Sequence, residues 1–273
     1  MISTIRAAVN IISRWSYRFR QQFGGSLPSD YMTFDCETTG FDRQKDLITE
    51  FGYCTVIDKK VENRDSFLLN WYEIPEMSEF LDNRLAAVAR AMQIQNRPWS
   101  ITPARVKAEG RPPKEAVAAI YDILDSWQKR GMLMIGHNAL RFDCPMLLSH
   151  FSQDLGKDFV FDPNLVLDTG CIEKASQLND ARALPLDGET LADYANRIIA
   201  IRAKVKWSLD GWCVPKYGLA EKHKLDAGAM HTAGEDAYVL HLLFEEYRRL
   251  AGELPPAPKP VVGHIDGERQ RRR

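Results

Sequence analysis

The 273-residue sequence lacks paired cysteine motifs and long apolar runs. Its five cysteines are scattered, none is spaced as CxxC, and their number is odd. A disulfide framework and a structural zinc site are therefore both disfavoured, and a reducing compartment is expected. Because no apolar run reaches the ~18 residues that a membrane-spanning helix needs, no integral membrane segment is expected.

The chain also lacks an excess of charge of either sign. The 36 Lys and Arg residues against 37 Asp and Glu residues give a formal net charge of −1. This balance excludes nucleic-acid binding through an overall positive charge, so any such binding must use local patches or a metal. The length and the hydrophobic fraction of 45% fit one large domain with a full core.

Acidic residues are missing from residues 1–23, where four arginines accompany an apolar stripe at helical spacing. We interpret residues 1–27 as a basic amphipathic leader helix and a linker. Three alternatives stay open for this helix: packing on the domain or touching nucleic acid, lying on a membrane surface, or acting as a mitochondrial transit peptide. The first goes with a cytoplasmic protein of bacterial or phage-like type, and the transit peptide (residues 1–24) with a mitochondrial one.

Residues 28–251 have the pattern of an α/β domain, with an insertion near 72–96 and a disordered Pro-rich and basic tail at 252–273. The predicted strands cover residues 31–35, 47–57, 61–71, 132–136 and 164–168. The predicted helices cover residues 80–92, 102–109, 112–130, 143–151, 169–178, 190–203 and 232–250, with a short one around Leu219. Three strands in sequence, followed by helices alternating with strands, indicate a sheet of mixed direction flanked by helices.

Two carboxylates stand at the end of the first predicted strand, in the stretch "TFDCETTG". Asp35 and Glu37 are two residues apart, so in an extended segment they face the same way. Two close like charges raise the pKa of one of them unless a cation intervenes. Mg²⁺ suits such a pair, because it takes carboxylate oxygens and substrate phosphates as ligands.

Two more acids follow structural landmarks. Asp143 comes after the apolar strand "MLMIG" and opens a helix, where by itself it reads as an N-cap. Asp236 lies in the first turn of the last helix, after a capping box formed by Thr232 and Glu235, and points along the apolar stripe. By itself it reads as an acid that stabilises the helix dipole.

Taken together, the segments "FDCETTG", "GHNALRFD" and "HTAGEDA" resemble, in this order, the DEDDh (DnaQ-like, polymerase III epsilon-type) 3′–5′ exonuclease family of the ribonuclease H-like superfamily. The resemblance covers roughly residues 30–250. It implies a mixed five-stranded sheet flanked by helices, with the second strand antiparallel. One departure is the six-residue step from His137 to Asp143, where many members have five.

The resemblance also implies roles for individual residues. Four carboxylates would hold two Mg²⁺ or Mn²⁺ ions, and a histidine before the last helix would be the general base. The implied catalytic residues are Asp35, Glu37, Asp143, His231 and Asp236, all but His231 being metal ligands. The implied substrate-binding residues are Thr38, Thr39, Gly40, His137 and Asn138. Phe41 could stack on the substrate or simply pack.

The function expected from this resemblance is metal-dependent hydrolysis of phosphodiester bonds from the 3′ ends of single-stranded or frayed DNA. A two-metal mechanism would release nucleoside 5′-monophosphates, in proofreading or repair. The alternatives are an exoribonuclease of the same family and a non-catalytic nucleic-acid-binding or polymerase accessory module. The expected partners are the 3′ ends of DNA or RNA single strands and, for proofreading, a DNA polymerase subunit.

Overall fold

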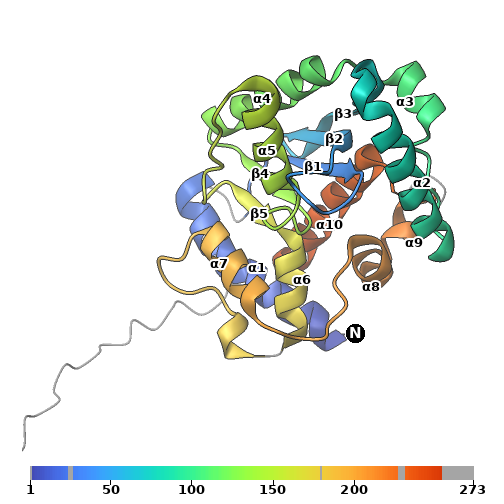
Figure 1. Ribbon diagram of the computed structural model, residues 1–273. Coiled ribbons are helices and arrows are strands. Elements are labelled where there is room, and N and C mark those ends of the chain that lie inside the picture. The colour runs from blue at the N-terminus through green and yellow to red at the C-terminus, as the bar shows by residue number, and fades with distance from the viewer. Residues whose placement is uncertain (1, 24–26, 179, 227–230, 254–273) are drawn as a thin grey trace, which may run out of the picture.

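A five-stranded sheet in the order β3-β2-β1-β4-β5 forms the centre of the molecule (Figure 1). The computed structural model describes residues 2–23, 27–178, 180–226 and 231–253. The strands are β1 (Tyr31–Thr38), β2 (Ile48–Ile57), β3 (Lys60–Leu68), β4 (Leu133–Gly136) and β5 (Val166–Asp168). β2 runs antiparallel to β1 and β3, whereas β4 is parallel to both β1 and β5. The predicted mixed sheet with an antiparallel second strand is confirmed.

Helices cover both faces of this sheet, in two layers that Figure 1 shows above and below the strands. Because successive side chains of a strand point to opposite faces, β1 sends Met32, Phe34 and Cys36 toward one layer and Tyr31 and Thr33 toward the other. The first layer consists of α4 (Pro113–Lys129) and α5 (Asp143–Leu155). The second consists of α1 (Ile2–Phe23), α6 (Thr169–Leu178), α7 (Leu191–Ala200) and α10 (Ala233–Glu253).

The segment predicted to be an insertion forms two short 3₁₀ turns and α2 (Ser78–Ile94). α2 packs through Leu85 on β3 and on α3 (Pro103–Glu109). Between α7 and α10 lie a π-helical turn (Leu209–Cys213), α8 (Val214–Tyr217) and α9 (Leu219–His223). The predicted tail lies, from residue 254 on, outside the described residues, as do residues 24–26 of the predicted linker.

The N-terminal helix α1 is part of the core. Ala8, Ile11, Ile12 and Trp15 are at most 2% exposed, and they lie in the apolar cluster formed with α6, α7 and α10. The Trp15 ring meets the ring of Tyr194 edge-on, with the centroids 5.5 Å apart. Of the alternatives for this helix, packing on the domain is the one that the structure shows. Among the described residues, no helix is long and apolar enough to cross a bilayer.

A buried ion pair ties this second layer together. The Glu173 carboxylate, in α6, is fully buried and accepts hydrogen bonds from Lys216 Nζ (2.6 Å), Tyr217 Oη (2.7 Å) and Tyr247 Oη (2.7 Å). A buried charge is tolerated only when it is paired and its remaining lone pairs are satisfied, as they are here. The pair therefore fixes α8 against α6 and α10.

Replacing Trp15 with alanine tests whether α1 belongs to the folding unit. Loss of a buried Trp side chain should lower the free energy of unfolding by about 3–5 kcal/mol. The measurement is urea denaturation followed by circular dichroism. Arg14→Ala, one residue away on the exposed side of the helix, is the matched control and should change stability by less than about 0.5 kcal/mol. Equal midpoints for the two variants would contradict the assignment.

Candidate metal centre

The start of α10 approaches the sheet closely enough to bring its first turn to the acids of β1. At Gly52, in β2, any β-carbon would overlap the backbone of Ala233 and Gly234. The neighbouring Glu50 is 1% exposed, and its Oε2 accepts a hydrogen bond from the Ala233 N–H (3.2 Å). Gly52 and Glu50, two residues apart on β2, therefore hold the N-terminal end of α10, the positive end of its dipole, against the strand.

This seating gathers three carboxylates. Asp35 and Glu37 in β1 and Asp236 in α10 each offer an oxygen, and these oxygens lie within 4.8 Å of one another. In the β1–β2 register, Glu37 is paired with Glu50, so the neighbouring strand carries a further carboxylate next to these three. The structure thus brings together three of the four predicted metal ligands at one edge of the sheet.

The fourth predicted ligand, Asp143, reaches the same strand from the other helical layer. Its Oδ1 accepts a hydrogen bond from the backbone N–H of Cys36, between the two β1 acids, at 2.9 Å. Asp143 is the first residue of α5, and the residue in the N-cap position is Phe142. The interpretation of Asp143 as the N-cap is therefore wrong, because Phe142 holds that position and the Asp143 carboxylate bonds to β1.

The electrostatics of this group favour a cation. Burial, followed by repulsion from Asp143 and Asp236, raises the pKa of Asp35 well above its usual value. Burial and the nearby Asp236 do the same for the pKa of Glu37. Burial raises the pKa of Asp143 and of Asp236 to about 7. Each shift has the sign expected where charged carboxylates lack compensation.

The donor set fits a hard divalent cation. In the part of the chain that the structure describes, none of these four carboxylates forms an ion pair with a Lys or Arg side chain. Several carboxylate oxygens at one partly exposed place are the ligands that Mg²⁺ and Mn²⁺ prefer. A cation here would also remove the mutual repulsion that raises the pKa values.

His231 stands immediately before α10, with its backbone in the left-handed region (φ 73°). Its N–H lies 3.4 Å from Asp236 Oδ1, and its ring Nε2 is 3.8 Å from an oxygen of Asp210 in the π-helical turn. Asp210 in turn forms an ion pair with Arg97 at 2.6 Å. Burial lowers the pKa of His231, and Asp210 opposes this shift. His231 therefore lies next to the acidic group with an acidic neighbour of its own.

His137, at the tip of β4, has both ring nitrogens engaged. Its Nε2 lies 2.6 Å from the carbonyl oxygen of Trp207, so this nitrogen carries the hydrogen and donates it. Its Nδ1 lies 2.9 Å from the hydroxyl oxygen of Thr169, whose hydrogen is directed at the Gly136 carbonyl oxygen, 3.0 Å away. Burial lowers the pKa of His137, in keeping with this neutral form. The ring thus fixes the loop between α7 and α8 and has no free nitrogen for substrate.

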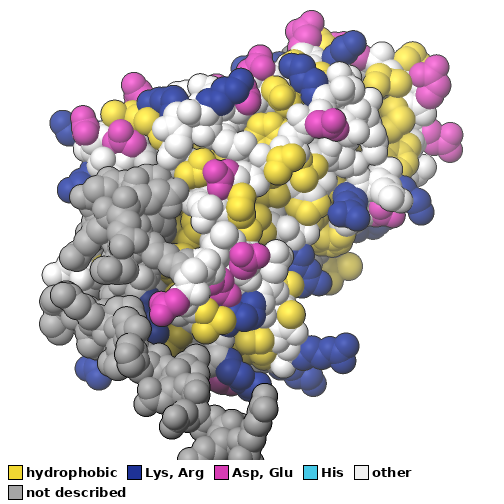
Figure 2. All heavy atoms as spheres, turned by 90° about the vertical axis from the view of Figure 1, so that its left-hand side faces the viewer, with side chains coloured by type: hydrophobic (Ala, Val, Ile, Leu, Met, Phe, Trp, Pro, Cys, Tyr) yellow, Lys and Arg dark blue, Asp and Glu magenta, His cyan; other side chains and the backbone are white. Residues whose placement is uncertain are grey.

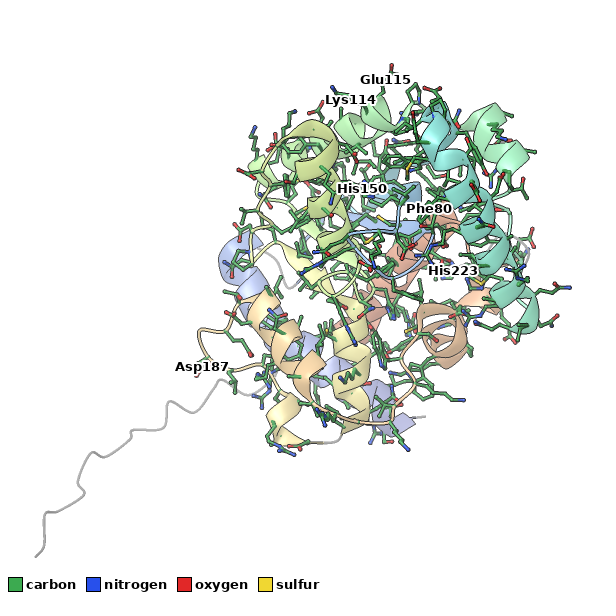
Figure 3. All side chains as sticks on the ribbon, in the orientation of Figure 1. Phe80, Lys114, Glu115, His150, Asp187 and His223 are labelled. Carbon is green, nitrogen blue, oxygen red and sulfur yellow. The ribbon has the colours of Figure 1, made fainter. Side chains whose placement is uncertain are left out.

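His150 is another interior histidine, and Figure 3 shows it among the strands and helices of the body. Its Nδ1 pairs with Asp154 at 2.7 Å, and its Nε2 lies 3.3 Å from the Ile48 N–H. Its ring also lies against that of Trp71, with the centroids 5.2 Å apart. Because Ile48 begins β2, His150 supports the end of the loop that follows the β1 acids.

Asp168, which sequence reasoning did not select, organises the loop after β4. Its carboxylate accepts hydrogen bonds from the N–H groups of Asn138 (2.8 Å), Leu140 (3.2 Å) and Cys171 (3.1 Å). Asn138 adopts a left-handed backbone (φ 62°), which asparagine tolerates better than most residues. Its side-chain Oδ1 is buried and has no hydrogen-bond partner in the described structure. Its position at the end of a predicted strand was the one feature of the sequence that could have marked Asp168 as a site residue.

The loop after the β1 acids is braced from inside. The Thr39 side chain is buried, and its Oγ1 donates to Asp46 Oδ1 (3.0 Å) and accepts from the Leu47 N–H (2.9 Å). Gly40 leaves room for the Asp46 carboxylate, because a β-carbon there would overlap it. Arg84 of α2 pairs with the same carboxylate at 3.0 Å. The hydroxyl of Thr39, which was expected to meet substrate, is therefore used within the protein.

Next to this loop an aromatic side chain projects into solvent. Phe41 is 91% exposed, and its ring lies 5.6 Å from that of Phe142, the residue before Asp143. Both residues line a cavity of about 400 Å³. Its lining consists of Phe41, Asp42, Arg43, Arg141, Phe142, Pro145 and Met146. The lining of this cavity thus combines two aromatic rings with two arginines beside the acidic group.

The five-stranded mixed sheet, its helical layers and the acids at the end of β1 define a ribonuclease H-like α/β protein of the nuclease class. A family model described as "Exonuclease" matches residues 32–198, which is more than half of the chain, and the chain belongs to that family. The match contains Asp35, Glu37 and Asp143 and ends before His231 and Asp236. No curated protein matches the sequence.

The fold is also similar to that of solved exonuclease I structures. One is the zinc-bound complex of E. coli exonuclease I with single-stranded DNA, with a TM-score of 0.53 and 14% identity over 82% of this chain. Another, described as suggesting how exonuclease I achieves processivity, has a TM-score of 0.53 and 15% identity over 82% of this chain. The match covers only 41% and 42% of those two chains. At such identity the likeness shows the fold alone.

The close approach of α10 to β2 can be tested with Gly52→Ala. Because the added methyl group meets backbone atoms that cannot rotate away, the variant should lose about 1–3 kcal/mol of stability. Displacement of Asp236 should also weaken Mn²⁺ binding, measured by isothermal titration calorimetry. The control is Gly252→Ala, where a β-carbon meets nothing within 4 Å. Unchanged Mn²⁺ affinity in folded Gly52→Ala protein would contradict this account of the site.

Stability in the absence of metal should depend on pH through these carboxyl groups. A group with a higher pKa in the folded state binds more protons when folded, so stability falls as pH rises between the two pKa values. For Asp143 and Asp236 this interval runs from 3.8 to about 7. With a chelator present, the unfolding temperature should fall from about pH 5 to about pH 7.5 more steeply for wild type than for Asp143→Asn. Parallel curves for the two proteins would contradict the prediction.

Proposed function

We propose that this protein is a divalent-metal-dependent 3′–5′ exonuclease that shortens single-stranded or frayed DNA and releases nucleoside 5′-monophosphates. The observation that carries the proposal is the convergence of Asp35, Glu37 and Asp236, with Asp143 bonded to the same strand. They come from three elements far apart in the sequence and have no cationic side chain to neutralise them among the described residues. Such a group is costly to a protein unless it holds cations.

The four carboxylates would hold two Mg²⁺ or Mn²⁺ ions, which supply Lewis-acid stabilisation of the attacking and leaving oxygens in phosphodiester hydrolysis. The protein's own part is to keep the carboxylates in place. The β1 backbone sets Asp35 and Glu37, the Cys36 N–H fixes Asp143, and the seating of α10 sets Asp236. Each of these supports involves a backbone group, and the seating of α10 also uses the buried Glu50 carboxylate.

His231 is the proposed general base, which takes a proton from the attacking water. Burial lowers the pKa of its ring, which keeps the ring neutral and able to accept a proton near pH 7. Asp210, 3.8 Å from Nε2, is placed to stabilise the charged ring once the proton has moved. His137 does not suit this role, because its Nδ1 and Nε2 are both engaged with protein groups.

The terminal nucleotide would lie between the β1 acids and the aromatic side chains beyond them. Thr38 and Gly40 offer the backbone of the loop, and the exposed ring of Phe41 offers a stacking surface. The buried and unpartnered Oδ1 of Asn138 is a hydrogen-bond acceptor near the same strand ends. Whether the sugar is deoxyribose or ribose depends on contacts to the 2′ position, which the assay below compares directly.

The test is incubation of 5′-labelled single-stranded DNA and RNA of one sequence with Mg²⁺ or Mn²⁺. Wild type should give a ladder that shortens by one nucleotide at a time and should release nucleoside 5′-monophosphates, identified by chromatography. Phosphorothioate linkages at the 3′ end should slow the reaction, and the same linkages at the 5′ end should not. Slowing only by 5′ linkages would reverse the proposed polarity, and a faster reaction on RNA would make the protein an exoribonuclease.

Two variants assign the roles within this assay. Asp35→Asn should lower activity by more than about 100-fold, because loss of a direct ligand exceeds the effect of changing an outer contact. His231→Ala should lower kcat by about 100- to 10,000-fold, as expected for a general base, and leave Mn²⁺ affinity nearly unchanged. Arg14→Ala serves as a surface control. If Asp35→Asn keeps wild-type activity, the observed nuclease is a contaminant and the proposed site is wrong.

A further inference from the structure

The segment between α7 and the π-helical turn, residues 201–208, is largely exposed. Arg202, Lys204 and Lys206 are exposed, whereas Val205 and Trp207 are half-buried. The residues of this segment form no helix or strand. In an extended segment every second side chain points the same way, and the Cα atoms of such residues lie about 6.6 Å apart. The segment therefore carries three positive charges in a row toward solvent.

This basic segment is fastened to the domain along its length. Lys174 Nζ donates to the Ile199 carbonyl oxygen just before it (3.0 Å), and Gln177 Nε2 donates to the carbonyl oxygen of Lys206 (2.5 Å). His137 holds the Trp207 carbonyl oxygen at 2.6 Å. Its backbone is thus held by α6 and by the tip of β4, and the three cationic side chains are left to extend outward.

The basic segment leads to the candidate metal centre. Trp207 lies against the ring of His137, with the centroids 5.9 Å apart, and His137 follows β4, the neighbour of β1 in the sheet. Three residues further on, Asp210 faces His231. A strand with its 3′ end among the acids could therefore pass directly onto residues 207 to 202.

The three cations have no acidic partner among the described residues. By contrast, Arg97, Arg182 and Arg197 are each paired with a carboxylate. Figure 2 shows one face of the molecule, on which Lys and Arg side chains are interspersed among Asp and Glu. Against such a background and a net charge of −1, three unpaired cations in sequence form a local field that attracts a polyanion.

We propose that Arg202, Lys204 and Lys206 bind phosphates along the single strand whose 3′ end lies at the acids. The inference rests on the proposed exonuclease function and names the contacts that the strand makes behind its terminal nucleotide. From Trp207 to Arg202 an extended chain spans at most about 17 Å. At about 3.4 Å per nucleotide, this corresponds to about five nucleotides.

The first test measures binding without catalysis. A fluorescein-labelled dT₁₂ is titrated in chelator, with anisotropy as the readout, at several salt concentrations. Each phosphate contact to a single strand contributes about −0.7 to the slope of log Kobs against log salt, so the triple Gln variant at 202, 204 and 206 should have a slope shallower by about 2. The control triple variant is Lys59→Gln, Lys60→Gln and Lys129→Gln, at the opposite ends of β2, β3 and β4 from the acids. It should keep the wild-type slope.

The second test separates the basic segment from the catalytic centre. On thymidine 5′-p-nitrophenyl phosphate, which has no strand beyond the nucleotide, the segment variant should match wild type. On oligothymidylates its loss in kcat/KM should grow with length up to about five nucleotides and then stay constant near tenfold. If the segment variant keeps the wild-type salt slope, the inference is overturned, whatever the activity. If wild type hydrolyses neither substrate while the slope changes as expected, the proposed function fails and the binding surface stands.

Discussion

The candidate site depends on the contact between the first turn of α10 and the middle of β2. Four carboxylates repel one another, so nothing in their own chemistry assembles them without a cation. The fold does this instead, through a strand glycine that admits a helix backbone and through Glu50, which bonds to the Ala233 N–H. The close packing of α10 on β2, which deforms little, thus offsets the electrostatic repulsion between Asp236 and Asp35. The packing of α10 on β2 therefore sets the position of Asp236.

Much of the fold followed from simple periodicities. The apolar residues that lead into the acids of β1 and the apolar run of β4 identified the central strands. The first turn of α10 was placed by its Thr232 cap, which accepts from the Glu235 N–H at 3.3 Å. Strand ends and helix starts carried the acids, but Asp35, Glu37 and Asp236 were named together only through the resemblance of three segments to a known family. Local pattern by itself suggested a cap at Asp143, which instead is the first residue of α5 and bonds to β1.

The residues that sequence reasoning missed are acids whose partners are distant. Glu50 meets Ala233 across 183 residues, and Asp168 meets Asn138 across 30. Nothing next to them distinguishes them from solvated acids, because burial and pairing arise only when the chain is folded. The same limit applies to Thr39, whose hydroxyl turned inward to Asp46, and to α1, whose stripe could equally have faced lipid. Local sequence states what a side chain is, and the tertiary fold decides which way it faces.

The burial of α1 has a consequence for how the protein is made. A ribosome releases the chain from its N-terminus, so the apolar face around Trp15 emerges before the helices that cover it. The surfaces that cover it belong to α6, α7 and α10, all from the second half of the chain. Until they emerge, a nascent chain carries an uncovered amphipathic helix, and long-range closure of this kind is slow. Synthesis of this protein thus includes an interval in which α1 is open to chaperones or to misassembly.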